Sequence, residues 1–395
     1  MNIRRINYNH RIQRILLYLL AIFLHPFLKV KKGRVICFAY GGDQYSCNPR
    51  YISEYILNHE LKQFDIYWLF QRKNVPAKID GRIKIVIYRT IRAVIAINTA
   101  EFVITNKRTD PWQYAWVKKR GQKYIMTWHG GNPLKKIELD AIEVLGPAYL
   151  RKMKNDSSYC DLFLSGSRYT SDIYRKSFLY DGEILEKGLP RNDIFFTPSK
   201  HVEIKDKVFN HFGFNDDDKI VLYAPTFRKK MDLTCYSIDW GKIIPAFEDL
   251  LHGNVKVLIR LHPNFLGGNI DRTTIFNALN VYDATTYDDI NDLIISSDVM
   301  ITDYSSCMFD FAFMRRPIFI FATDVDEYDR GFYVNIRELP LHFSQNNEEL
   351  LLNIKKFDNI KYQEELEYLM NVFFHGFDTG QATKCVVDWM ISRGL

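Results

Sequence analysis

The sequence predicts an α/β protein that contains two doubly wound parallel sheets. Short apolar runs alternate with helical stretches, which is typical of parallel strands covered by helices on both faces. The alternation begins again near Lys219, after a polar stretch. The chain has 395 residues, whereas single hydrophobic cores stop growing near about 250–300 residues. Two domains of similar size are therefore expected.

The first half of the chain contains six predicted strands. Each is a short apolar run that is followed by turn residues or by a helical stretch. The runs cover 34–40, 65–70, 84–88, 101–105, 123–127 and 161–165. Helices are predicted over 50–59, after Asn48-Pro49, and near 91–99. This half is predicted to form an N-terminal domain over 33–200.

The second half repeats the pattern. Its predicted strands cover 219–223, 256–260, 281–282, 299–302 and 317–321, with a helix near 290–296. The join lies in the polar stretch 197–208, which contains Pro198. A C-terminal domain is therefore predicted over 201–395. In an alternative arrangement, the last helix of this domain packs on the N-terminal domain.

The charge of the chain is concentrated at the N-terminus. Residues 1–34 carry eight Lys and Arg and no acid, which leaves 45 Lys and Arg against 47 Asp and Glu in the other 361 residues. A nearly neutral body argues against nucleic-acid binding, which usually needs a basic stripe on the folded domain. The six cysteines are scattered without a CxxC pair, so a disulfide framework and a structural zinc site are not expected.

Residues 1–32 are predicted to form a basic amphipathic helix at a membrane surface. The apolar run 15–24 is too short to span a bilayer, which takes about 20 residues. No small-residue cleavage site follows it, as a signal peptide would require. Basic residues on both sides suit a helix that lies on an anionic leaflet. The alternative is a buried N-terminal helix of the first domain.

Ligands of doubly wound sheets bind beyond the carboxyl ends of the strands, and four polar motifs follow predicted strands. In the first, His129 precedes Gly130 and Gly131. Histidine is the usual general base near neutral pH, and glycines let a substrate approach the backbone closely. The alternative is a turn histidine that only ends a strand. The nearby pair Lys135-Lys136 has two interpretations: it attracts an anionic substrate, or it is a solvated part of the surface.

The second motif, Tyr223-Ala224-Pro225-Thr226-Phe227-Arg228-Lys229-Lys230, delivers a hydroxyl and three cations at a strand end. Thr226 and Arg228 are its candidate substrate-binding residues, because a guanidinium holds a phosphate with a fork of donors. An ordinary basic loop is the alternative.

The third motif, Arg260-Leu261-His262-Pro263, places Arg260 and His262 two residues apart. In an extended segment the two side chains point the same way, which suits contact with a pyrophosphate. The alternative is a buried histidine whose hydrogen bonds are satisfied within the fold.

The fourth motif is Thr302-Asp303-Tyr304-Ser305-Ser306, between a strand and an apolar stretch. Ser305 and Ser306 at the start of a helix offer hydroxyls and backbone N–H groups, which form an anion site. Asp303 is included as a candidate substrate-binding residue. Serines also serve routinely as simple N-caps, and capping is compatible with phosphate binding.

Together the motifs resemble the CDP-glycerol glycerophosphotransferase family, which makes teichoic-acid and related capsule polymers in bacteria. The resemblance covers Trp128 to Gly380. Its segments are Trp128-His129-Gly130 with Pro133-Leu134-Lys135, Gly188-Leu189-Pro190-Arg191-Asn192-Asp193, Tyr223-Ala224-Pro225-Thr226-Phe227-Arg228, Arg260-Leu261-His262-Pro263, Asp303-Tyr304-Ser305-Ser306 and Phe377-Asp378-Thr379-Gly380.

The resemblance implies a GT-B-like fold, in which two Rossmann-like domains enclose the active site in an interdomain cleft. It implies that the domain over 33–200 binds the acceptor and that the domain over 201–395 binds the CDP donor. It implies His129 as the base that deprotonates the acceptor, and His262, Ser305 and Ser306 as contacts of the donor phosphates. Motif position and chemistry assign Arg228 and Arg260 to phosphate neutralisation. The family commonly has His-Gly-Thr-Pro, whereas this chain has a loop that is one residue longer, with Gly131 and Asn132.

The resemblance also implies the reaction and its partners. The donor is CDP-glycerol or CDP-ribitol, and the acceptor is a hydroxyl of a membrane-linked polymer precursor at the cytoplasmic face of the cell membrane. No cofactor is expected. The sequence itself does not require a metal, because Asp288-Asp289 is interpreted as a charge pair at a helix start and not as a metal-binding pair, and metal dependence stays open. The competing readings are a GT-B glycosyltransferase with a nucleotide-sugar donor, a non-enzymatic membrane scaffold and a polyanion binder.

Overall fold

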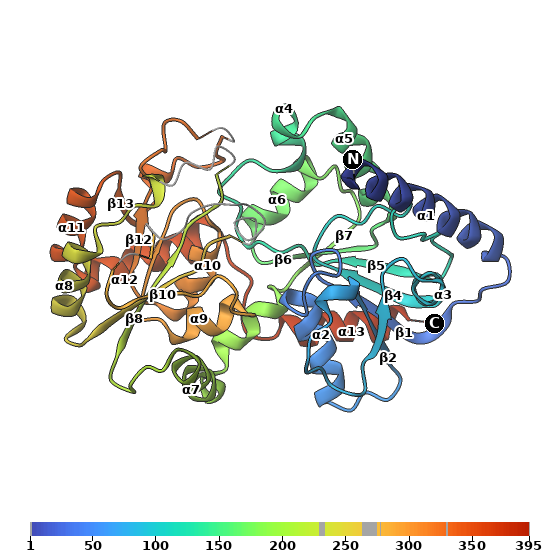
Figure 1. Cartoon of the computed structure of the whole chain (residues 1–395), viewed down its shortest axis with the longest axis horizontal. Helices are drawn as coiled ribbons and strands as arrows, with labels where there is room; N and C mark the ends of the chain where they lie inside the picture. The colour runs from blue at the N-terminus through green and yellow to red at the C-terminus, as the bar shows by residue number, and fades with distance from the viewer. Residues whose placement is uncertain (1, 229–233, 263–274, 277, 329–330, 395) are drawn as a thin grey trace. The chain divides into compact units, whose positions relative to one another are not determined.

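The computed structural model describes residues 2–228, 234–262, 275–276, 278–328 and 331–394, with no side chains described before residue 11. These residues form two compact units (Figure 1). Unit 1 comprises residues 1–129, 138–193 and 377–395, and unit 2 comprises residues 130–137 and 194–376. The chain therefore passes from one unit to the other directly after His129.

Unit 1 is built on a sheet of seven parallel strands in the order β3-β2-β1-β4-β5-β6-β7. The strands are β1 Lys31–Phe38, β2 Asp65–Phe70, β3 Lys84–Ile87, β4 Ala100–Thr105, β5 Lys123–Met126, β6 Leu162–Ser165 and β7 Glu183–Glu186. This is the strand order of a dinucleotide-binding fold, in which the order reverses between β1 and β4. Six of the strands were predicted, whereas the edge strand β7 was not.

Helices cover both faces of this sheet. They are α1 Asn2–Leu24, α2 Cys47–Asn58, α3 Ile91–Thr99, α4 Ile142–Leu145, α5 Pro147–Tyr159, α6 Arg168–Ser177 and α13 Ala382–Arg393. The last helix, α13, lies beside α2 although it ends the chain (Figure 1). Its residues Val386 and Met390 are fully buried in one core with Ile52 of α2 and Trp68 of β2.

Unit 2 repeats the arrangement with a sheet of six parallel strands, in the order β10-β9-β8-β11-β12-β13. The strands are β8 Lys219–Ala224, β9 Val255–Ile259, β10 Val281–Asp283, β11 Val299–Thr302, β12 Ile318–Phe321 and β13 His342–Ser344. Five of them were predicted. The order reverses between β8 and β11, which is where ligands bind in this class of sheet.

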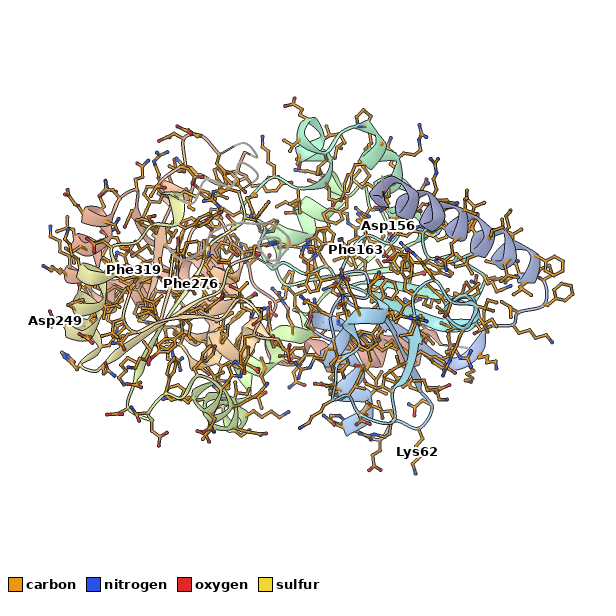
Figure 2. The ribbon with its side chains drawn as sticks, in the orientation of Figure 1. Lys62, Asp156, Phe163, Asp249, Phe276 and Phe319 are labelled. Carbon is orange, nitrogen blue, oxygen red and sulfur yellow. The ribbon has the colours of Figure 1, made fainter. Side chains whose placement is uncertain are left out.

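The helices of unit 2 pack on the faces of its sheet. They are α7 His201–Phe212, α8 Trp240–Leu251, α9 Ile290–Ser296, α10 Cys307–Phe311, α11 Asn347–Lys355 and α12 Asn359–Glu367. Phe319 of β12 lies in the core of unit 2, as Phe163 of β6 lies in that of unit 1 (Figure 2). Charged side chains such as Lys62 and Asp249 point outward.

Over the part of α1 with described side chains, residues 11–24, one side of the helix packs on the rest of unit 1. Ala21 is fully buried in a small cluster with Val94 of α3 and Ala115. Among residues 11–28, whose side chains the structure describes, seven large apolar side chains are exposed: Ile12, Ile15, Leu16, Leu19, Ile22, Phe23 and Phe27. Among the described residues, no helix is both long enough and apolar enough to cross a membrane.

Candidate active site

His129 stands on a strained turn at the carboxyl end of β5. The strand ends at Met126, and Trp128 adopts a left-handed conformation with φ of 54°. Such a conformation costs a residue other than glycine about 1–3 kcal/mol and persists only where its surroundings enforce it. Holding His129 in this position therefore lowers the stability of the fold.

The His129 ring is held by the segment that follows β4. Its Nδ1 lies 2.8 Å from the main-chain oxygen of Asn106. A carbonyl oxygen only accepts, so in the neutral ring Nδ1 carries the proton and Nε2 keeps its lone pair. Asn106 is fixed in turn, because its Oδ1 accepts from the N–H of Tyr40 at 2.7 Å. This tautomer leaves Nε2 as the nitrogen that can accept a proton from a hydroxyl.

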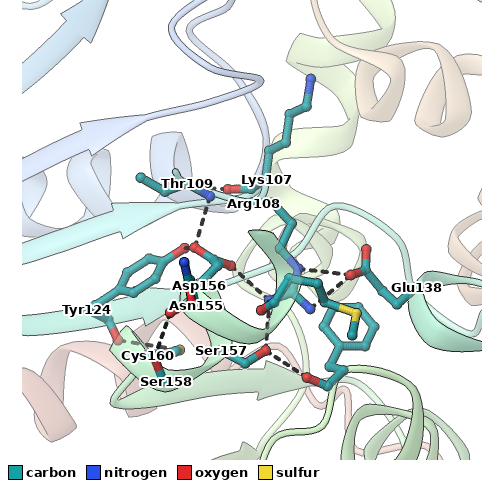
Figure 3. Close-up of polar contacts among 12 residues, drawn as sticks. Lys107, Arg108, Thr109, Tyr124, Glu138, Asn155, Asp156, Ser157, Ser158 and Cys160 are labelled. Carbon is teal, nitrogen blue, oxygen red and sulfur yellow. Dashed lines mark hydrogen bonds and ion pairs between the residues drawn. The ribbon is translucent and has the colours of Figure 1, made fainter. Parts of the chain in front are cut away.

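A buried ionic network anchors the chain just beyond Asn106. Arg108 donates to Glu138 from Nε at 3.0 Å and to Asp156 from Nη1 at 2.8 Å, and the three side chains are almost fully buried (Figure 3). Burial alone would lower the pKa of Arg108, but the charges of Glu138 and Asp156 outweigh it and raise the pKa. Tyr124 of β5 also donates to Asp156, at 2.9 Å. The network thus ties the Asn106 segment to the strand that carries His129.

The residues after His129 belong to unit 2. There Lys136 donates its N–H to the Gly331 oxygen at 3.0 Å, and Tyr333 donates its N–H to the Leu134 oxygen at 2.9 Å. Gly131 has no positive φ, and a Cβ on it would lie 3.5 Å from Asp310, an ordinary contact distance. The folding of the chain therefore does not itself require this glycine, and close approach of a substrate there stays a prediction.

Three aromatic rings connect this segment with the Asp-Tyr-Ser-Ser motif inside unit 2. Phe332 forms an antiparallel bridge with Lys135. Its ring lies 5.1 Å from Tyr304 and 5.3 Å from Tyr328, and the two tyrosine rings are 4.3 Å apart. Such clustered rings restrain one another. The loop that follows His129 and the predicted phosphate-binding motif thus contact the same cluster of aromatic rings.

Thr226 and Asp303 meet at the point where the second sheet reverses its strand order. Thr226 follows β8, Asp303 follows β11, and both are buried. The Asp303 carboxylate accepts from the Thr226 N–H at 2.9 Å and from the Thr226 hydroxyl at 3.0 Å. It also accepts from the N–H of Tyr304 at 2.6 Å. These two predicted substrate-binding residues therefore bind each other.

Arg228 is occupied by carboxylates in the structure. Its Nη1 lies 2.8 Å from Asp303, and its Nε and Nη2 donate to Asp324 at 2.6 and 3.0 Å. The guanidinium also lies over the Tyr304 ring, 4.7 Å from its centre. Burial raises the pKa of Asp324, but the hydrogen bond and charge of Arg228 outweigh it, so the pKa is lowered. These contacts favour a bracing role, and phosphate binding by Arg228 stays a prediction.

Ser305 and Ser306 lie directly before α10. The Cys307 N–H points to the Ser305 hydroxyl at 3.5 Å, and the Ser306 side chain makes no capping hydrogen bond. The helix has five residues, so its dipole contributes less than that of a longer helix. The hydroxyls and N–H groups are the main anion-binding groups that this turn offers.

Arg260 and His262 follow the end of β9. The Arg260 guanidinium donates to the Tyr287 oxygen at 2.5 Å. The side chain of His262 keeps access to solvent, yet the protein atoms crowded around it and the positive charge of Lys135 lower its pKa. His262 is therefore neutral near pH 7. Pro263 and the pair Lys229-Lys230 of the predicted motifs lie outside the described residues.

The two remaining motifs lock together inside unit 1. Asp378 accepts from the N–H of Leu189 at 2.8 Å and from the side-chain amide of Asn192 at 3.1 Å. Gly188 has φ of 91°, and a Cβ there would come within 2.8 Å of Asp378. Asp193 accepts from two N–H groups at the start of α13. These contacts hold the two motifs together and tie them to the start of α13.

Within each unit the structure brings together part of the predicted set. Thr226, Arg228 and Asp303 form one network in unit 2, and His129 is the predicted residue that unit 1 supplies. Sequence reasoning missed Asn106, for which the only signal is its position directly after a strand. Among the described residues, no group of three or more His, Cys, Asp or Glu is placed to hold a metal ion.

Comparison with known proteins places these features in a family. The family described as CDP-Glycerol:Poly(glycerophosphate) glycerophosphotransferase matches residues 20–392. The teichoic acid poly(glycerol phosphate) polymerase of Staphylococcus epidermidis is 32% identical over 379 residues, which cover 91% of this chain and 50% of the relative. The polymerase of that name from Bacillus spizizenii is 30% identical over 369 residues, which cover 90% of this chain and 91% of the relative. The chain thus spans about half the length of the first relative.

The fold agrees with a solved structure. A variant of the wall teichoic acid polymerase TagF, soaked with CDPG, superposes with a TM-score of 0.82 at 29% identity, over 98% of this chain and 97% of that chain. The prediction of a GT-B-like protein with two doubly wound domains is thereby confirmed. The chain belongs to the CDP-glycerol:poly(glycerophosphate) glycerophosphotransferase family.

Proposed function

We propose that the chain transfers glycerol phosphate or ribitol phosphate from a CDP-alditol to a hydroxyl of a teichoic acid or related polymer precursor. One observation carries the chemistry: the Asn106 carbonyl holds Nδ1 of His129, which leaves Nε2 as a base. The names of the relatives support the donor class. The reaction releases CMP.

In the proposed step, His129 Nε2 takes the proton of the acceptor hydroxyl. The hydroxyl oxygen then forms a bond to the β-phosphorus of the CDP-alditol. The bond between that phosphorus and the bridging oxygen breaks, and CMP leaves with the electron pair. His262, Arg260, Ser305 and Ser306 hold the phosphate of the leaving CMP, and the Arg260 guanidinium neutralises part of its charge. Positioning and charge neutralisation supply most of the rate in transfers of this kind.

The donor is tested by titrating the purified protein calorimetrically with CDP-glycerol, CDP-ribitol and UDP-glucose. Release of CMP is then measured with each binder and a lipid-borne glycerol-phosphate oligomer as acceptor. We expect one CDP-alditol to bind and to yield CMP. Binding of UDP-glucose alone, with release of UDP, would instead place the chain among the nucleotide-sugar glycosyltransferases.

Donor affinity is expected to rise as the pH falls. The pKa of His262 in the free protein lies below its ordinary value of 6.5. An anionic diphosphate bound to the ring favours the protonated form, so binding takes up a proton. The dissociation constant of CDP-glycerol is therefore expected to decrease between about pH 7.5 and pH 5.5. Calorimetry across this range measures it.

The replacement His262→Asn is expected to remove this pH dependence. The matched control is His252→Asn, because His252 is exposed and has φ of 52°, a conformation that asparagine tolerates. The control should keep the wild-type slope. Identical slopes in both variants would show that His262 does not titrate against the donor.

We further propose that α1 holds the protein at the cytoplasmic face of the membrane, where a lipid-linked acceptor lies. Leu16 and Phe23 are 60% and 69% exposed, whereas Leu17 and Ala21 pack on unit 1. The run Lys29 to Arg34 adds four cations. An apolar face with basic neighbours suits an anionic bilayer.

Flotation with vesicles of phosphatidylglycerol and phosphatidylcholine tests this anchoring. The combined replacement of Leu16, Leu19 and Phe23 by serine is expected to weaken vesicle binding by about 1,000-fold or more, since each buried apolar side chain contributes about 1.5–3 kcal/mol. The control replaces the exposed Leu352 and Ile360 of unit 2 by serine. Equal flotation of both variants would place the anchor elsewhere.

A further inference from the structure

Asn48, at the start of α2, reaches the turn that carries His129. Its side chain is fully buried. Its Nδ2 donates to the main-chain oxygens of Thr127 at 3.3 Å and Trp128 at 3.0 Å. The amide therefore grips the two residues that precede His129, including the one with the left-handed conformation.

Arg191, in a third segment of the chain, also forms hydrogen bonds with this turn and with Asn48. Its Nη1 donates to the main-chain oxygen of His129 at 2.8 Å, and its N–H donates to Oδ1 of Asn48 at 3.0 Å. The side chain is 6% exposed. Three consecutive carbonyls, those of Thr127, Trp128 and His129, thus each accept from one of two buried side chains.

We propose that Asn48 and Arg191 are positioning residues that hold His129 in its reactive place. A left-handed residue such as Trp128 persists only where its surroundings over-determine it. These contacts hold its carbonyl and the two beside it, and the Thr127 hydroxyl adds a further hydrogen bond to the Trp128 oxygen at 3.0 Å. With the main chain held, the His129 ring keeps its Nδ1 on the Asn106 oxygen. This inference rests on the proposed role of His129 as base.

The role is separable from general stability because the chain offers a matched asparagine. Asn98 of α3 is also fully buried. Its Nδ2 donates to the oxygens of Val94 and Ala115, and its Oδ1 accepts from the N–H of Val117. Asn98 therefore makes the same three kinds of hydrogen bond as Asn48, but none to the His129 turn.

The experiment compares Asn48→Ala with Asn98→Ala in the full chain. CMP release is measured with CDP-glycerol and the lipid-borne glycerol-phosphate oligomer, CDP-glycerol binding by calorimetry, and folding by thermal melting. Displacement of a reacting group by 1 Å costs about 100-fold in rate. We expect kcat of Asn48→Ala to fall by 10- to 100-fold with donor affinity unchanged, and kcat of Asn98→Ala to stay within about two-fold, although both lower the melting temperature.

A second variant keeps the test independent of the folding of Asn48→Ala. Arg191→Met retains the apolar stem and removes the donor to the His129 oxygen, so it is also expected to lower kcat at constant donor affinity. In a background of His129→Ala, it should cause no further loss, because it acts through His129. A further loss there, or kcat of Asn48→Ala equal to that of Asn98→Ala, would overturn the inference. Absence of CMP release by the wild type would instead refute the proposed function.

Discussion

Replacement of His129 by alanine is expected to lower CMP release about 1,000-fold, within the range of general-base catalysis. The neutral ring, with Nδ1 on the Asn106 oxygen, is the proposed acceptor of the hydroxyl proton, and alanine leaves no base in its place. His129 belongs to unit 1, whereas the donor motifs belong to unit 2. Affinity for CDP-glycerol should therefore stay within about two-fold, as calorimetry would show.

A control histidine distinguishes the effect of losing the base from the effect of losing a hydrogen bond between a histidine ring and the main chain. His59 of unit 1 also places Nδ1 on a main-chain oxygen, that of Tyr55, at 2.9 Å. Its replacement by alanine should leave CMP release unchanged. Near-normal turnover of His129→Ala would remove it from the role of base, and equal losses in both variants would indicate an effect on folding.

Most of the fold could be predicted because its buried strands are nearly continuous apolar runs. Leu162–Ser165 and Val299–Thr302 are fully buried and flanked by turn residues, so hydrophobicity alone marks them. The edge strands β7 and β13 were missed. Glu183–Glu186 and His342–Ser344 are short, partly exposed and polar, and each pairs with one neighbour, so their strand character comes from the sheet and not from their own sequence.

The site was predictable as a set of motifs, but not as a set of contacts. His129 and Asp303 follow apolar strands, and that position marked them. The grip on the His129 turn depends on residues far away in the sequence: Asn48 lies 80 positions from Trp128 and 143 from Arg191. Only the fold brings such residues together. Arg191 lies in a motif that carried the family resemblance, but the sequence showed nothing of its partner.

A large separation in sequence also explains why the partners of Arg228 were not predicted. A cation after a strand, followed by two lysines, suggested a phosphate ligand. Asp324, which it binds through two nitrogens, lies 96 positions later and precedes no recognisable motif. A sequence pattern shows which charges a loop offers. It does not show which of them the protein itself neutralises.

Replacement of Arg228 by methionine is expected to destabilise unit 2 strongly. Methionine fills much of the space but leaves Asp303 and Asp324 without their cation, and their side chains are only 2% and 24% exposed. Loss of one partner of a buried ion pair costs about 3–5 kcal/mol. The melting temperature should then fall by about 10 °C for a unit of this size. Differential scanning calorimetry of the full chain measures the shift.

The control replaces Arg337 by methionine. Arg337 also holds an aspartate through two contacts, to Asp326 at 2.8 and 2.9 Å, but both side chains are exposed. Exposed pairs contribute little, so this variant should melt close to the wild type. If Arg228→Met instead melts normally and loses only CDP-glycerol affinity, Arg228 is a phosphate ligand and not a brace.

The pH dependence of stability tests the proposed structural role of Arg228 through the titration of its partner Asp324. Arg228 lowers the pKa of Asp324 in the folded state, so the unfolded chain binds more protons as the pH falls. The stabilisation is present above the unfolded carboxyl pKa of about 3.9 and is lost as the pH falls through the lower, folded value. Arg228→Met should lose this contribution, and the further change Asp324→Asn should restore part of the melting temperature. Recovery follows because it removes a half-buried carboxylate that no longer has a cation.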